Sequence, residues 1–382
     1  DKLSDSLHEA LTQRFIDRRT SALLKGLKRE DALLAGISED GEVTVEGHFV
    51  GQLDGLEFKP DPRTSSGLEG KAVRNAALRA LRPEVSRCLA QIAHAADEDI
   101  TLGRDGRVHV GRAAVARLSQ GAPVLKPRLE VIGGEQASEL ERSAARERLE
   151  LWLAQLVAHD LRPLVALENA WRDGRLPPDA RGLAFRLIEN AGALDRAHED
   201  LDRISETARH SLRRHGVRLG AHTVFMPALV KPRAAHTLAL LWRAAHPDAE
   251  HPLFLARPGA LSVPINERRS WGELAAAGYR ACGRTAVRLD LVEKLAEAIH
   301  ADTPPNDVAL ARLLGLPARE LGGVLNALGY RATHDGEARR WRRVKPRRKR
   351  RDETASDNAF SALASLLPPA SAAPRRRRGG PA

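Results

Sequence analysis

The sequence predicts a mainly α-helical protein with small β-hairpins, an α+β chain built from several modules. Three observations lead to this class. The chain has 382 residues, which is more than one ordinary core accommodates. Two segments repeat one hairpin pattern, and most of the other segments carry apolar residues at helical spacing. A further hairpin signal follows two short helical stretches near the C-terminus, which predicts a winged-helix-like module there.

The chain opens with a stretch that predicts one long helix over residues 1–36. Apolar side chains recur on one helical face at Leu3, Leu7, Leu11 and Phe15. The first residue is Asp1, and the helical pattern is already running there. We therefore expect this helix to continue from a segment upstream of the chain.

Residues 37–172 predict a duplicated unit made of a β-hairpin and a helix. Residues 40–60 and 105–127 both begin with Asp-Gly and continue with Val-x-Val. An offset of 65 residues matches four apolar positions of the first copy to four of the second, Val43, Val45, Val50 and Leu53 to Val108, Val110, Val115 and Leu118. A helical stretch follows each copy, at about 67–96 and about 136–170. Chance similarity between two short hairpins is the alternative.

The next region, residues 173–302, predicts a helical accessory domain. Its apolar run at 216–232 contains the chain's only methionine, Met226, and ends at Lys231 and a proline. No acidic residue or histidine stands next to Lys231 in the sequence to lower its pKa, so a catalytic lysine is not expected. The run therefore predicts a short extended segment buried in the core.

Two modules complete the predicted organisation. Residues 303–344 predict two short helices followed by a two-stranded wing that turns at Asp335-Gly336. Residues 345–382 are rich in Arg, Pro, Ala and Ser and have no periodicity, which predicts a disordered basic tail.

Charge is concentrated at this C-terminal end. The net charge of the chain is +11, but residues 339–382 contain fourteen basic residues against three acidic ones. The remaining residues 1–338 carry 47 basic and 47 acidic residues and are neutral. Because the basic residues cluster, they predict contact with a polyanion such as a nucleic acid.

No catalytic, cofactor or metal motif is recognisable elsewhere in the sequence. The stretch SSGLEGKA at 65–72 has Gly-Lys, but it lacks the first glycine and the final Ser or Thr of a phosphate loop. The two cysteines, Cys88 and Cys282, have no partners at ligand spacing and are expected to be buried thiols. We expect no catalytic residue, no cofactor and no metal in this chain, and a cytoplasmic location with no membrane contact.

The candidate site is therefore a basic nucleic-acid-binding surface on the wing and the tail. Its predicted residues are Arg339, Arg340, Arg342, Arg343, Lys345, Arg347, Arg348, Lys349, Arg350, Arg351, Arg375, Arg376, Arg377 and Arg378. Trp341 lies among them and either stacks on a base or packs against the core of its own module. Arginines on a flexible arm have no fixed geometry for reading bases, so the expected contacts are to phosphates and independent of sequence. A solvated tail that aids solubility is the alternative.

Six blocks of the sequence, taken in order, resemble the C-terminal half of alphaproteobacterial DExH helicases. These blocks are LSDSLHEALTQRFIDRRTSALL, GEVTVEGHFVGQLDGLEFKPD, ARGLAFRLIENAGALDR, HGVRLGAHTVFMPALVKP, ACGRTAVRLDLVEKLAEAI and LLGLPARELGGVLNALGYR. The family is related to the mitochondrial degradosome helicase of the suppressor-of-Var type, and the resemblance covers most of residues 1–344. It implies an accessory region that follows two motor domains, with ATP and magnesium bound only by those motors.

The motor motifs of that family have no counterpart in this sequence. There is no phosphate loop, no Asp-Glu-x-His box and no arginine-finger motif, so no motor residue can be transferred to a position here. We expect the chain alone not to hydrolyse ATP. The leading hypothesis is an accessory region that holds RNA for helicase motor domains in cis. Two alternatives are a docking scaffold, for example for a ribonuclease, and a sequence-specific DNA-binding regulator that uses the winged module.

Overall fold

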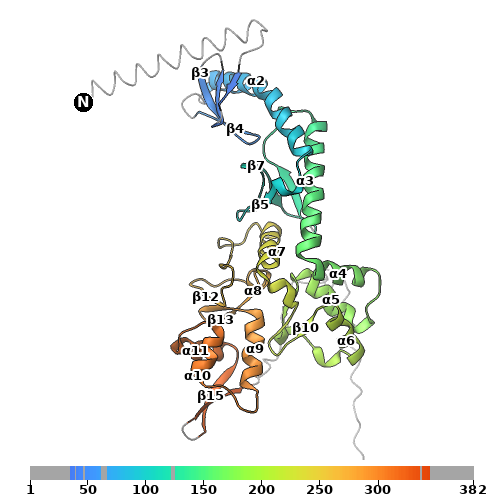
Figure 1. Ribbon diagram of the computed structural model, residues 1–382, viewed down its shortest axis with the longest axis vertical. Coiled ribbons are helices and arrows are strands. Elements are labelled where there is room, and N and C mark those ends of the chain that lie inside the picture. The colour runs from blue at the N-terminus through green and yellow to red at the C-terminus, as the bar shows by residue number, and fades with distance from the viewer. Residues whose placement is uncertain are drawn as a thin grey trace, which may run out of the picture.

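The structure is a computed structural model that describes residues 35–344, apart from short gaps at 39, 46–47, 62–66, 122–124 and 336–337. Most of the predicted first helix and the whole predicted tail lie outside these residues. The described part has ten α-helices and five small antiparallel sheets, so the predicted α+β class is confirmed. Figure 1 shows an elongated molecule with two sheets at one end and the winged-helix module at the other.

The first half of the molecule consists of two units of the same build, each a four-stranded antiparallel meander followed by a long helix. The first unit comprises β1 (Ala35–Ile37), β2 (Glu42–Val45), β3 (His48–Asp54), β4 (Glu57–Pro60) and α2 (Gly67–Ala93). The second comprises β5 (Ile100–Leu102), β6 (Arg107–Val110), β7 (Ala113–Ser119), β8 (Arg128–Val131) and α3 (Glu139–Asp160). The sequence predicted a hairpin of two strands in each unit, whereas each unit has four strands. The additional strands were not recognised because strands of three or four residues give little periodicity.

The two meanders agree in detail at the offset of 65 residues that the sequence indicated. The register of β2 and β3 shifts between Val43 and Thr44, and that of β6 and β7 shifts between Val108 and His109. The Leu53 amide donates to the Gly41 carbonyl at 2.7 Å, and the Leu118 amide donates to the Gly106 carbonyl at 3.0 Å. Shared strand order, shared bulge and shared turn contact favour duplication over chance similarity.

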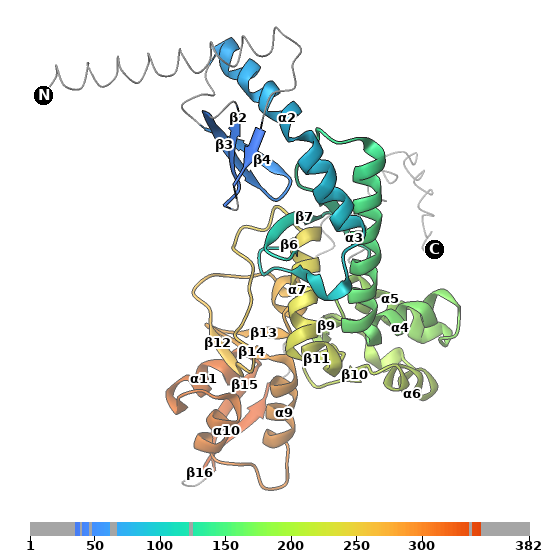
Figure 2. The same cartoon turned by 45° about the horizontal axis from the view of Figure 1, so that its top comes forward.

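The long helices of the two units lie side by side, as Figure 2 shows, and they cover the sheets. The buried side chains of α2 recur every three or four residues, at Leu81, Val85, Leu89 and Ile92. Helix α3 begins with a capping box in which Ser138 and Glu141 bond each other's backbone amides. Burial of each Leu or Val contributes on the order of 1.5–3 kcal/mol, so apolar periodicity is what stabilises this end of the molecule.

The region predicted as helical, residues 173–302, contains two three-stranded sheets as well as helices. Helix α4 (Arg162–Arg172) ends just before this region, whose own helices are α5 (Pro178–Glu189), α6 (Glu206–Arg214), α7 (Pro232–Ala245), α8 (Trp271–Ala276) and α9 (Leu289–Ile299). One sheet has the order β10–β11–β9, with β9 (Ala193–Asp195), β10 (Arg218–Leu219) and β11 (Thr223–Phe225). The other has the order β12–β14–β13, with β12 (Ser262–Pro264), β13 (Tyr279–Cys282) and β14 (Thr285–Arg288).

The apolar run at 216–232 is a tight β-hairpin rather than a single extended segment. Strands β10 and β11 form it, and a short 3₁₀ turn leads into α7. Val224, Phe225 and Met226 are at most 1% exposed, which confirms that the run belongs to the core. Lys231 is exposed and occupies the N-cap position of α7.

The C-terminal module is a three-helix winged helix. Helices α10 (Asp307–Leu314) and α11 (Ala318–Ala327) precede a wing made of β15 (Tyr330–Asp335) and β16 (Ala338–Arg343). The apolar core of this module also contains Val292, Leu295 and Ile299 from α9. This core extends across the boundary predicted at 303, because α9 supplies the third helix. In the described part of the chain, no helix is both long enough and apolar enough to cross a membrane.

Candidate nucleic-acid interface

The wing is positioned by the two short helices before it. Asn306 caps α10 by accepting a hydrogen bond from the amide of Ala309 at 2.9 Å. Gly315 ends α10 in the left-handed conformation, at a φ of 66°, which redirects the chain into α11. The Val344 amide donates to the Gly329 carbonyl at 2.9 Å and closes the base of the wing.

The two-residue turn of the wing lies one position further along the chain than the sequence predicted. The strands close at Asp335 opposite Ala338, so the two intervening residues are 336 and 337 and not Asp335-Gly336. Each partner is displaced by two residues, which leaves the described side chains on the faces that alternation predicted. Tyr330, Ala332, Trp341 and Arg343 share one face of the wing.

Trp341 packs into the module and presents no ring face to a ligand. Its side chain is 8% exposed and belongs to the apolar core with Leu310 and Leu321. The indole Nε1 donates to a carboxylate oxygen of Asp307 at 2.8 Å. Of the two roles considered for Trp341, core packing is the one that the structure has, and base stacking is incompatible with this burial.

The other face of the wing is basic. It carries Arg331, Thr333, Arg340 and Arg342, and the described side chains of all four are exposed or on the outer surface. Arg331 lies directly opposite Arg342 in the register, an arrangement of like charges that destabilises a sheet by a few tenths of a kcal/mol. Within the described residues, no hydrogen bond or ion pair connects Arg342 to another side chain. Arg342 therefore gives this face positive charge that no described side chain neutralises.

Arg343 lies on the inner face of the wing, opposite Tyr330, beside a buried polar cluster. The Tyr330 hydroxyl is 3.1 Å from the Nε2 atom of His222 at the turn between β10 and β11. Burial, followed by the charges of Arg343 and Arg280, lowers the pKa of His222 to about 3, so this imidazole is neutral. Burial also raises the pKa of the Tyr330 hydroxyl to about 12.

Glu293 of α9 connects this cluster to the hairpin turn. Its carboxylate accepts hydrogen bonds from the backbone amides of Ala221 and, at 3.0 Å, His222. The side chain is 2% exposed, and burial raises its pKa while these hydrogen bonds oppose the rise. A Cβ atom on Gly220 would overlap the Glu293 carboxylate, so the turn requires glycine there. The hydrogen bonds of this cluster hold the winged-helix module against the preceding hairpin.

The remaining predicted site residues have no described side chain. Eleven of the predicted basic residues have side chains outside what the structure describes, namely Arg339, Lys345, Arg347, Arg348, Lys349, Arg350, Arg351, Arg375, Arg376, Arg377 and Arg378. Arg331 was not among the residues that the sequence predicted for this site. The signal was present, because strand alternation places Arg331 on the same face as Arg340 and Arg342.

Helix α11 occupies the position that reads bases in a helix-turn-helix protein, but its side chains are poorly suited to that role. Its exposed positions include Arg319, Glu320, Gly323 and Asn326, and a glycine pair interrupts the helix centre. The turn at Gly283 between β13 and β14 lies against Gly323, close to the same helix. This composition disfavours sequence-specific reading of a DNA groove.

Fold and surface together give the chain a winged-helix-like module whose wing is basic on its outer face. No family model, no curated protein and no solved structure matches the chain. In the part of the chain that the structure describes, no group of three or more His, Cys, Asp or Glu side chains could hold a metal ion. Cys282 is buried, and burial raises the pKa of its thiol to about 12.

Proposed function

We propose that this chain is an accessory region that binds RNA for an ATP-dependent helicase motor, through its wing and the basic segment after it. The observation that carries the proposal is the outer face of the wing, where Arg331, Arg340 and Arg342 lie on adjacent strands. Like charges placed opposite each other destabilise a hairpin and become favourable when a phosphate lies between them. Strand β16, which carries Arg340 and Arg342, is followed in the sequence by the basic run that begins at Lys345.

The binding that this surface supports is independent of nucleotide sequence. Arginine pairs phosphate oxygens in a bidentate manner, and phosphate contacts position a nucleic acid without reading its bases. Tyr330 and Trp341, the aromatic side chains described in the wing, are both buried, so neither can stack on a base. ATP and magnesium belong to the proposed motor domains, in cis, and a ribonuclease is a further proposed partner.

The experiment uses a double variant of the wing in the full chain, Arg340→Glu with Arg342→Glu. Both side chains lie on the outer face, so the variant keeps Trp341 in the core. We expect affinity for a single-stranded RNA of mixed sequence to fall on the order of tenfold at about 0.1 M salt. The slope of log affinity against log salt concentration should fall by about 1.4, since each lost phosphate contact removes about 0.7.

The matched control is Arg181→Glu with Arg213→Glu, which makes the same change of charge on the exposed surface of α5 and α6. A second comparison is a fragment that ends at Val344, which removes the tail and keeps β16 intact. Affinity unchanged in both the wing variant and the fragment would overturn the proposal. That outcome would favour the docking scaffold instead.

A further inference from the structure

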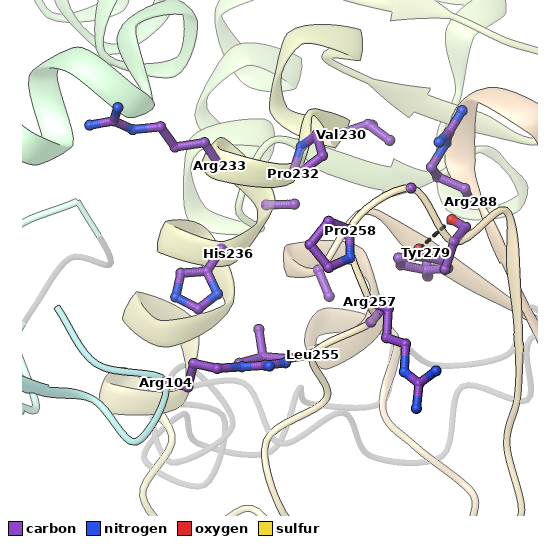
Figure 3. Close-up of a pocket in the computed structure, with 15 residues that line it drawn as sticks. Arg104, Val230, Pro232, Arg233, His236, Leu255, Arg257, Pro258, Tyr279 and Arg288 are labelled. Carbon is purple, nitrogen blue, oxygen red and sulfur yellow. Dashed lines mark hydrogen bonds between the residues drawn. The ribbon is translucent and has the colours of Figure 1, made fainter.

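A hollow with a volume of about 360 Å³ lies between the turn that joins β5 to β6, the helix α7 and the loop before β12. Figure 3 shows it, with Arg104 extending beneath the ring of His236 toward Leu255. It lies far from the wing, since Figures 1 and 2 both place α7 beside the second meander and the wing at the opposite end of the C-terminal half.

Four arginines line this hollow, and only two of them have acidic partners. Arg233 is paired with Asp160 at 2.6 Å, and Arg288 is paired with Asp290 at 2.6 Å. The side chains of Arg104 and Arg257 are exposed and form no hydrogen bond or ion pair with any other residue that the structure describes. The rim of the hollow therefore has two positive charges that the protein does not neutralise, one on each side.

The wall of the hollow is apolar and rigid. Pro232, Leu255 and Pro258 line it, and both prolines are exposed. The Tyr279 hydroxyl is already used, since it donates to the Ala260 carbonyl at 2.7 Å. Burial, followed by the charge of Arg104, lowers the pKa of His236, so its ring is neutral and can donate or accept one hydrogen bond. A flat apolar wall with a cationic rim has the chemistry of a site for a base and its phosphate.

The hollow continues beyond Arg104 into a second one of about 680 Å³. Arg104 lines both, and Arg117 and Arg243 line only the second. Arg117 is paired with Glu130, whereas Arg243 donates only to the backbone carbonyls of Ala249 and His251. A further uncompensated charge thus follows Arg104 along the surface, which suits a chain of phosphates better than a free mononucleotide.

We infer that this hollow binds one nucleotide of a single-stranded RNA, with the base against Pro232 and Pro258 and the flanking phosphates at Arg104 and Arg257. The inference rests on the proposed function for the identity of the ligand, and it adds a second contact at a place that the wing does not reach. The strand runs from this site past Arg104 toward Arg243.

The test compares three double variants of the full chain for binding of a fluorescent twelve-nucleotide oligouridylate. Arg104→Glu with Arg257→Glu changes the hollow, Arg340→Glu with Arg342→Glu changes the wing, and Arg181→Glu with Arg213→Glu is the control. We expect the hollow variant to lose on the order of tenfold in affinity and the control to lose less than about twofold. A version with glutamine at positions 104 and 257 removes the charges without reversing them and covers the case in which the glutamate variant unfolds.

A second measurement locates the contact. Photocrosslinking with a 4-thiouridine oligonucleotide should yield peptides that contain residues 255–260 or the first turn of α7, and the hollow variant should lose these peptides. Wild-type affinity in the hollow variants together with weakened binding by the wing variant would overturn the inference and leave the proposed function intact. Absence of any binding to the wild-type chain would overturn both. The inference would also be overturned if the hollow bound uridine monophosphate while the hollow variants kept wild-type affinity for the twelve-nucleotide strand.

Discussion

The most specific polar contacts of this molecule are made by residues far apart in the sequence. Glu293 accepts two amides of the turn at 220–222, and Tyr330 bonds His222 across 108 positions. These side chains are buried among apolar residues, so their hydrogen bonds fix how the hairpin, α9 and the wing fit together. A single sequence contains no signal that a glutamate will contact a turn about seventy residues away, so the contact between Glu293 and this turn could not be predicted.

The pKa of His222 leads to a prediction for stability against pH. Its folded pKa of about 3 lies below the ordinary 6.5, so the unfolded chain takes up the proton first as the pH falls. Stability that is present above pH 6.5 is lost between about pH 6.5 and 3, by roughly 3 kcal/mol at pH 4. Glu293 acts in the opposite direction, because its raised pKa makes the folded state hold a proton more tightly.

A difference between variants isolates the effect of His222. His222→Gln removes the titrating ring, and His198→Gln changes an exposed histidine as the control. From pH 7 to pH 4 in urea unfolding, the free energy of unfolding should shift by roughly 3 kcal/mol in favour of His222→Gln relative to wild type. The groups facing His222 are Arg343, Arg280, Asp195 and His300, and all are retained in both variants. Equal pH dependence in wild type and His222→Gln would contradict the prediction.

At the scale of elements, short strands were the main difference between expectation and structure. The Asp-Gly and Val-x-Val patterns located β2, β3, β6 and β7, because glycine turns and alternating valines are strong local signals. Strands β9 to β13 have two to four residues each, and no alternation can be recognised over such a length. The faces of β16 could be predicted, whereas its exact partners depended on which two residues form the turn.

Trp341 allows a test of whether the wing is an integral part of its module. Trp341→Ala removes a buried indole that contacts the core and Asp307, so we expect a loss of about 3–5 kcal/mol of stability. Trp341→Phe keeps most of the apolar contact and loses the hydrogen bond, which costs about 1 kcal/mol. Arg342→Ala, one residue away and exposed, serves as the control. Thermal unfolding measures all three, and equal melting temperatures for Trp341→Ala and Arg342→Ala would contradict this account.

At the scale of the whole molecule, the N-terminal boundary of the winged-helix module can be tested by the stability of a fragment. The core of the winged helix takes Val292, Leu295 and Ile299 from α9, which precedes the boundary that the sequence suggested. A fragment of residues 303–344 therefore lacks one of its three helices and exposes the apolar sides of the other two. We expect this fragment to show no cooperative thermal transition by circular dichroism. A sharp, reversible transition would place the boundary back at 303.

Strands β13 and β14 give the molecule a mechanical property. Tyr279 and Arg288 on these strands line the hollow beside α7, while Cys282 and Val287 on the same strands lie in the core of the winged helix. These two paired strands of four residues each therefore connect the hollow to the module that carries the wing, the two places proposed to contact RNA. Under the proposed function, these strands would hold the two RNA contacts at a fixed distance from each other while a motor pulls the RNA.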